Sequence, residues 1–163
     1  VQYKSLLAYY HQLCEALGPL PPPRVVNVDH GRQRFLLFTL PATRAVGACS
    51  TPAFAWIDTP TSGADVDRQL QVTGWAFKDG EGLDRVEVLV NGKVAASAEY
   101  GKPSPGTEAF WKVSNDPNHP DVGFSASVDL SSATPGRHWL GLRLHGRDGS
   151  VEDWVEQPIQ VAK

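Results

Sequence analysis

The sequence contains no methionine, even at position 1, and only two cysteines among its 163 residues. From the missing methionine we expect a piece of a longer protein, with any signal peptide or membrane anchor outside it. Cys14 and Cys49 are too few for a disulfide scaffold and lack the CxxC spacing of zinc or thiol redox sites. They could form a disulfide in an oxidising compartment or stay as small buried apolar groups in a reducing one.

An excess of basic residues and a long apolar run are also missing. The chain has 15 Lys and Arg against 18 Asp and Glu, a formal charge of −3. We therefore expect no nucleic-acid partner, because such binding requires a basic surface. No apolar run approaches the ~18 residues that a membrane span requires, so we expect no membrane span in this fragment. The 15 Gly and 13 Pro favour many turns over long helices.

Residues 1–50 differ in pattern from the rest of the chain. Apolar residues recur there at spacings of three and four, which predicts one amphipathic helix. Its apolar stripe is Tyr3, Leu6, Leu7, Tyr10, Leu13, Cys14 and Leu17. Gly18 and the prolines after it end this helix, and residues 24–28 and 34–39 predict a β-hairpin. Because a helix and a hairpin are a thin basis for independent folding, we expect them to pack on the next domain or on the missing parent protein.

Residues 53–163 read as short alternating strands separated by turn residues. The pair Asn91-Gly92 between two alternating strands is the strongest hairpin indicator, because both turn residues must accept a positive φ. One later strand directs three alternating leucines toward a core: Leu140, Leu142 and Leu144. We count about seven strands, as in an immunoglobulin domain. The predicted fold class is mainly β: an immunoglobulin-like antiparallel β-sandwich with a small N-terminal helix plus β-hairpin.

A series of short motifs in residues 53–163 also has a recognisable order. The motifs are Asp58-Thr-Pro-x-x-Gly63, Val72-Thr-Gly-Trp75-Ala76, Val86-Glu-Val88-Leu-Val90-Asn-Gly92, Asp121-Val122-Gly123-Phe124, Pro135-Gly136-x-His138-x-Leu140 and Asp148-Gly149. Together they resemble bacterial immunoglobulin-like modules of cell-envelope and surface proteins. The resemblance implies a periplasmic or extracellular accessory module that docks a glycan or protein of the cell envelope. It would be tethered through the rest of its parent, which could be an enzyme such as an envelope glycosyltransferase.

Histidines, serines and carboxylates form no recognisable catalytic or metal-binding pattern. His138 and His145 are seven apart on one predicted strand, so they point to opposite faces and cannot share a metal. No Gly-x-Ser-x-Gly elbow occurs. The acidic stretch from Asp79 through Glu81 to Asp84 is too short for a twelve-residue calcium loop, and a solvated acidic turn explains it better. We therefore expect no catalytic residues, no metal and no cofactor in this chain.

Residues 101–123 form the longest predicted loop, whereas hairpin loops usually need about two to five residues. We interpret Trp111 as a flat surface for a sugar ring or a partner's side chain. The residues around it would complete the binding site: Phe110, Asn115, Asp116, His119 and Asp121. In the alternative interpretation, Phe110 and Trp111 fold back and close one end of the sandwich.

Two further tryptophans define a second candidate surface. Trp139 and Trp154 fall on strands joined by the predicted Asp148-Gly149 hairpin, so they could lie across from each other on an outward face near Arg143. Such a face could bind a glycan or a protein, or it could be covered by residues 1–50. The sequence thus favours a non-catalytic binding module. The alternatives are a small enzyme domain with its active site in residues 101–123 and a purely structural spacer.

Overall fold

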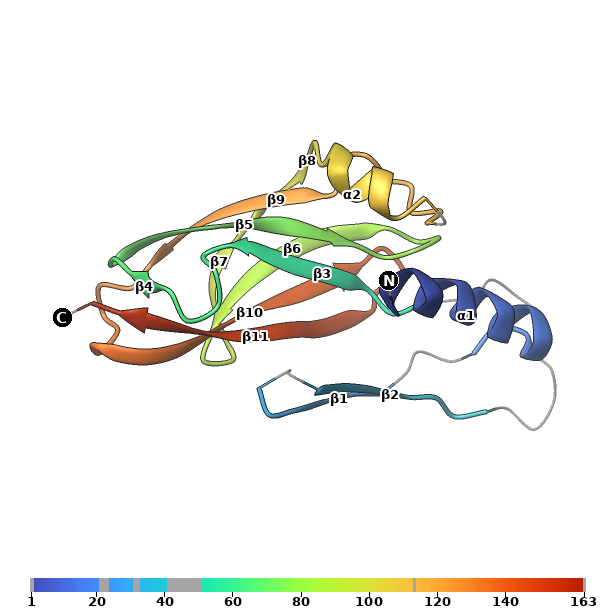
Figure 1. Ribbon diagram of the computed structural model, residues 1–163, viewed down its shortest axis with the longest axis horizontal. Coiled ribbons are helices and arrows are strands. Elements are labelled where there is room, and N and C mark those ends of the chain that lie inside the picture. The colour runs from blue at the N-terminus through green and yellow to red at the C-terminus, as the bar shows by residue number, and fades with distance from the viewer. Residues whose placement is uncertain (1, 21–23, 31–32, 41–50, 113, 163) are drawn as a thin grey trace.

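The computed structural model describes residues 2–20, 24–30, 33–40, 51–112 and 114–162. Most of these residues form a β-sandwich, with helix α1 (Gln2–Leu17) at one end (Figure 1). A hairpin of β1 (Arg24–Val28) and β2 (Gln33–Leu37) lies beside the sandwich. The predicted fold class, a mainly β immunoglobulin-like sandwich with an N-terminal helix and hairpin, is confirmed.

The sandwich consists of a five-stranded and a four-stranded sheet. The first has the order β4-β11-β10-β6-β7, with β4 (Asp65–Val66), β11 (Val151–Val161), β10 (Gly136–Gly146), β6 (Leu83–Val90) and β7 (Lys93–Ser97). The second has the order β3-β5-β9-β8, with β3 (Phe54–Thr59), β5 (Gln69–Phe77), β9 (Gly123–Asp129) and β8 (Glu99–Lys102). Neighbouring strands run antiparallel except β4 and β11. The described strands exceed the expected seven because β4 and β8 are too short to show an alternating pattern.

The main core lies between the two sheets and follows the predicted alternation. Leu140, Leu142 and Leu144 of β10 are buried, and so are Val86 and Val88 on the neighbouring strand β6. Apolar side chains alternate into this core because successive strand residues point to opposite faces. The turn after β6 is also confirmed, since Asn91 and Gly92 have φ angles of 51° and 77°.

A second hydrophobic cluster joins α1 to the outer face of the four-stranded sheet. Its buried members are Leu7, Tyr10, Phe54, Phe77, Trp111 and Val122, with Leu36, Phe38 and Trp75 packed against them. This cluster explains why β5 is apolar on both faces near its end. Ala76 points into the main core, whereas Trp75 and Phe77 point toward α1 and its neighbours.

Helix α1 ends where the sequence predicts. Gly18 has a φ of 78°, and its amide donates a hydrogen bond of 2.8 Å to the Cys14 carbonyl. Cys14 is disulfide-bonded, which matches the oxidised alternative for this residue; Cys49 lies outside the described residues. Within the part of the chain that the structure describes, no helix is long and apolar enough to cross a membrane.

Residues 101–123, predicted as one long loop, contain regular secondary structure. The segment contains the end of β8 and a short helix, α2 (Pro105–Phe110). Ser104 precedes this helix, and its carbonyl accepts a hydrogen bond of 3.0 Å from the Thr107 amide. Pro105 suits the first helical turn because its fixed φ is already helical and its missing N–H would have no partner there.

Candidate functional site

Trp111 lies in the aromatic cluster at the end of the sandwich. Its side chain is 3% exposed, and its ring centroid is 5.1 Å from that of Phe54 and 5.2 Å from that of Phe77. Phe110 packs edge-on against Trp111 and is 42% exposed. Trp111 therefore occupies the position described by the closing interpretation, and its ring does not present a flat face to solvent.

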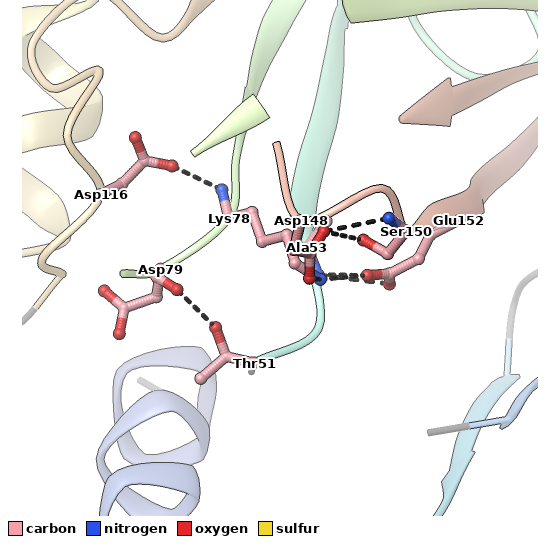
Figure 2. Close-up of polar contacts among 8 residues, drawn as sticks. All are labelled: Thr51, Ala53, Lys78, Asp79, Asp116, Asp148, Ser150 and Glu152. Atoms are coloured by element: carbon pink, nitrogen blue, oxygen red, sulfur yellow. Dashed lines mark hydrogen bonds and ion pairs between the residues drawn. The ribbon is translucent and has the colours of Figure 1, made fainter. Parts of the chain in front are cut away.

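Asp116, the next predicted loop residue, is 5% exposed. Its Oδ2 accepts a hydrogen bond of 2.6 Å from the Lys78 amide (Figure 2). Its Oδ1 accepts one of 2.7 Å from the Asn118 amide. Burial raises the pKa of the Asp116 carboxyl. The side chain thus fastens residues 114–118 to the end of β5.

Lys78 and Asp79 follow β5 directly and are also buried, at 1% and 4% exposure. The Lys78 ammonium lies 3.0 Å from Glu152 Oε1 and 3.6 Å from Asp148 Oδ2. Glu152 in turn accepts hydrogen bonds of 3.1 and 3.2 Å from the Ala53 amide (Figure 2). These contacts connect the end of β5 to the β10–β11 hairpin and to the start of β3.

Asp79 faces the N-terminal helix instead. Its Oδ2 lies 2.5 Å from His11 Nε2 on α1, and its Oδ1 accepts a hydrogen bond from the Asn115 amide. The Thr51 hydroxyl donates to the Asp79 carbonyl at 3.1 Å (Figure 2). The prediction that Asp79 lies in a solvated acidic turn is therefore wrong. We call Lys78, Asp79, Asp116 and Glu152 the buried polar network.

The remaining predicted loop residues have no shared arrangement. The His119 ring packs 5.1 Å from the Phe77 ring, and both its nitrogens are buried without a hydrogen-bond partner among the described residues. Asn115 and Asp121 are exposed. In the described ranges, no group of three or more His, Cys, Asp or Glu side chains is arranged to hold a metal ion.

The prediction that Trp139 and Trp154 share an outward face is wrong because β11 contains a bulge. Gly141 pairs with Glu156, but the next residue of β10, Leu142, pairs with Trp154. The extra residue in β11 switches the alternation. Trp154 therefore faces inward like Leu142, and its indole Nε1 donates a hydrogen bond to the Ala55 carbonyl.

Trp139 remains on the outer face of the five-stranded sheet. The His30 ring, in the turn after β1, stacks on it with 3.6 Å between centroids and 3° between planes. His30 also lies 3.3 Å from Glu156. Arg143 forms hydrogen bonds of 2.7 and 2.8 Å with Asp153. Trp139 thus has the covered position that the sequence left as an alternative.

The sequence reasoning missed Trp56. This residue of β3 is 51% exposed and pairs across the sheet with Trp75 of β5. Its neighbours Ala55 and Ile57 point into the main core, so Trp56 points outward. That alternation was present in the sequence and could have identified an aromatic side chain on a solvent-facing position.

Uncharged polar side chains continue the surface on which Trp56 lies. Gln71 and Thr73 occupy the outward positions of β5, and Ser127 and Ser125 face them on β9. The Gln71 amide donates a hydrogen bond of 3.0 Å to the Ser127 hydroxyl. We call this surface the Trp56 face and define it as Trp56, Gln71, Thr73, Trp75, Ser125 and Ser127.

Comparison with known proteins does not identify a family for this chain. No protein-family model and no curated protein matches the chain. One similar solved structure, an endo-beta-1,4-mannanase from Thermotoga petrophila, has 13% identity over 69% of this chain and 20% of that chain, with a TM-score of 0.48. Fibronectin(III)-like modules of Clostridium thermocellum CbhA have 16% identity over 66% of this chain and 94% of theirs, with a TM-score of 0.44. Similarities with such low sequence identities and TM-scores do not bear on the function of this chain.

Proposed function

We propose that the chain is a non-catalytic docking module of an envelope or secreted protein, which binds a glycan or protein and positions the rest of its parent. The observation that carries this proposal is the Trp56 face. An indole that is 51% exposed, beside exposed amide and hydroxyl groups, suits binding by contact area and hydrogen bonds. The disulfide-bonded Cys14 supports a periplasmic or extracellular location, because disulfides persist in oxidising compartments.

The buried polar network supports a non-catalytic role. Both carboxylate oxygens of Asp116 accept hydrogen bonds from backbone amides, and the Lys78 ammonium contacts the carboxylates of Glu152 and Asp148. Groups that could act as acid or base thus hold the chain's own segments together. A general base must instead reach a substrate proton within hydrogen-bonding distance.

A second candidate, an enzyme with its active site in residues 101–123, rests on His119. Its ring nitrogens have no hydrogen-bond partner among the described residues and would be available to a substrate. Both nitrogens are also buried against the aromatic cluster, however, so a substrate could reach them only if the loop moved. The docking proposal requires no such movement.

Co-sedimentation with isolated cell envelopes of the source organism tests the docking proposal. The wild-type chain should sediment with the envelopes, and the envelope polymers should keep their chain length without new reducing ends. A chain that stays in the supernatant would be a spacer and would contradict the proposal. Polymer cleavage that Asp116→Ala or His119→Ala abolishes would contradict it in favour of the enzyme alternative.

A further inference from the structure

We infer that the ligand of this module is a neutral glycan chain, which binds across the Trp56 face with one sugar ring stacked on Trp56. The inference rests on the proposed docking function and specifies its ligand and its site. The site differs from the surfaces that the sequence pointed to, because Trp111 and Trp154 are packed inside the molecule and Trp139 is stacked on His30.

Trp56 is suited to stacking because it is exposed on a rigid base. Its cross-strand neighbour Trp75 packs on Phe77 at 5.9 Å and on Trp111 at 6.2 Å between ring centroids. The two strands that carry Trp56 and Trp75 are thus anchored in the second hydrophobic cluster, which limits the backbone ordering that binding would cost. An indole also matches the C–H face of a pyranose, which is apolar while the ring edge carries hydroxyls.

Hydrogen-bonding groups lie on the neighbouring strands of the same face. The paired Gln71 and Ser127 side chains retain an amide oxygen and a hydroxyl hydrogen for further bonds. Thr73 and Ser125 pair across the same two strands. Adjacent strands are about 4.8 Å apart, close to the length of one pyranose unit, so successive sugar units could meet successive strands.

The charges around the Trp56 face argue against an anionic ligand, because exposed carboxylates lie beside it at Asp58 on β3 and Asp129 on β9. On the flanking strand β8, Lys102 Nζ lies 2.8 Å from Glu99 Oε2, so these two charges offset each other. Asp129, farther along β9, accepts a hydrogen bond of 3.1 Å from Gln69. An anionic polymer would need a basic surface, and a protein partner would favour a larger apolar centre than one exposed indole.

Affinity electrophoresis in gels that contain hydroxyethyl cellulose, galactomannan or the anionic polymer alginate tests the inference. At least one neutral polymer should retard the wild-type chain, and alginate should not. Trp56→Ala should weaken this binding about tenfold or more, the equivalent of a lost aromatic contact. Trp56→Phe should restore most of it, and Gln71→Ala should weaken it less. Trp139→Ala, on the other sheet, is the matched control and should bind like wild type.

Three results would overturn the inference: wild-type affinity in Trp56→Ala, stronger retardation by alginate, or no retardation by either neutral polymer. If the wild-type chain still co-sediments with envelopes in these cases, only the ligand and site are wrong and the docking function stands. If it does not sediment either, the proposed function fails too. Matching thermal melting curves for Trp56→Ala and wild type would show that lost binding is not lost folding.

Discussion

His11 Nε2 lies 2.5 Å from Asp79 Oδ2, and this contact joins α1 to the end of β5 across 68 positions of the chain. Asp79 is buried, whereas His11 is partly exposed. His11 therefore provides a hydrogen-bond partner for a carboxylate that is poorly accessible to water. Together with the second hydrophobic cluster, this pair fastens the N-terminal helix to the sandwich.

His11→Ala should lower the free energy of unfolding by about 1 to 3 kcal/mol, because it removes a hydrogen-bond partner from a buried carboxylate. Urea denaturation followed by circular dichroism measures this change. Lys102→Ala is the control, since it breaks the exposed Lys102–Glu99 pair and should cost at most about 1 kcal/mol. Equal effects of the two substitutions would show that the His11–Asp79 contact does not fasten the helix.

Lys78→Met should be among the most damaging single changes in the chain. The substitution keeps the aliphatic volume but removes the ammonium group that contacts Glu152 and Asp148. Removing one partner of a buried ion pair typically costs about 3 to 5 kcal/mol. Lys93→Met, on the exposed strand β7, should change stability by no more than about 0.5 kcal/mol. A near-wild-type denaturation midpoint for Lys78→Met would refute the role given to this pair.

Stability should respond to acid in opposite directions at two carboxylates. Burial raises the pKa of Asp116, so its carboxyl group holds a proton more tightly in the folded chain than in the unfolded chain. Asp116 therefore favours folding increasingly as the pH falls from 7 to about 4. The difference in unfolding free energy between wild type and Asp116→Asn should grow over that range.

Glu87 should show the reverse trend. A hydrogen bond from His145, at 2.8 Å, lowers the pKa of Glu87, so its contribution to stability is lost as the pH falls through that pKa. The difference between wild type and Glu87→Gln should shrink on acidification. Denaturation curves at several pH values measure both trends, and the same trend at both residues would contradict the account.

Trp111→Ala distinguishes packing from binding in residues 101–123. Removing a buried indole should cost about 3 to 5 kcal/mol of stability, because it leaves a cavity among Phe54, Trp75 and Phe77. Phe110→Ala, at a more exposed ring, should cost less. Thermal melting and binding to envelopes are measured on the same samples. If Trp111→Ala melts like wild type but no longer sediments with envelopes, Trp111 binds the ligand after all.

Local patterns predicted the sandwich well. Alternation placed Leu140, Leu142 and Leu144 in the core, and Asn91-Gly92 marked its hairpin, because both features depend on neighbouring residues only. The same alternation misplaced Trp154, since one extra residue in a strand reverses every later side chain. Nothing in the local sequence marks such a bulge.

The buried polar network could not be predicted for a different reason. The bond from the Lys78 amide to Asp116 spans 38 positions, and Lys78 lies 74 positions from Glu152. Such contacts depend on how the two sheets and the loops pack. The local sequence around each charged residue of the network therefore indicates only a solvated side chain. The exposure of Trp56, in contrast, follows from local alternation, because Ala55 and Ile57 on either side of it point into the core.

Nuclear magnetic resonance of the five tryptophan indole N–H groups tests the central claim most directly. Cellohexaose or mannohexaose is added stepwise to the ¹⁵N-labelled chain. The account predicts that the Trp56 indole signal shifts saturably with one of these sugars, while those of the packed Trp111 and Trp154 stay in place. A shift of the Trp139 signal without that of Trp56, or no shift with either sugar, would contradict it.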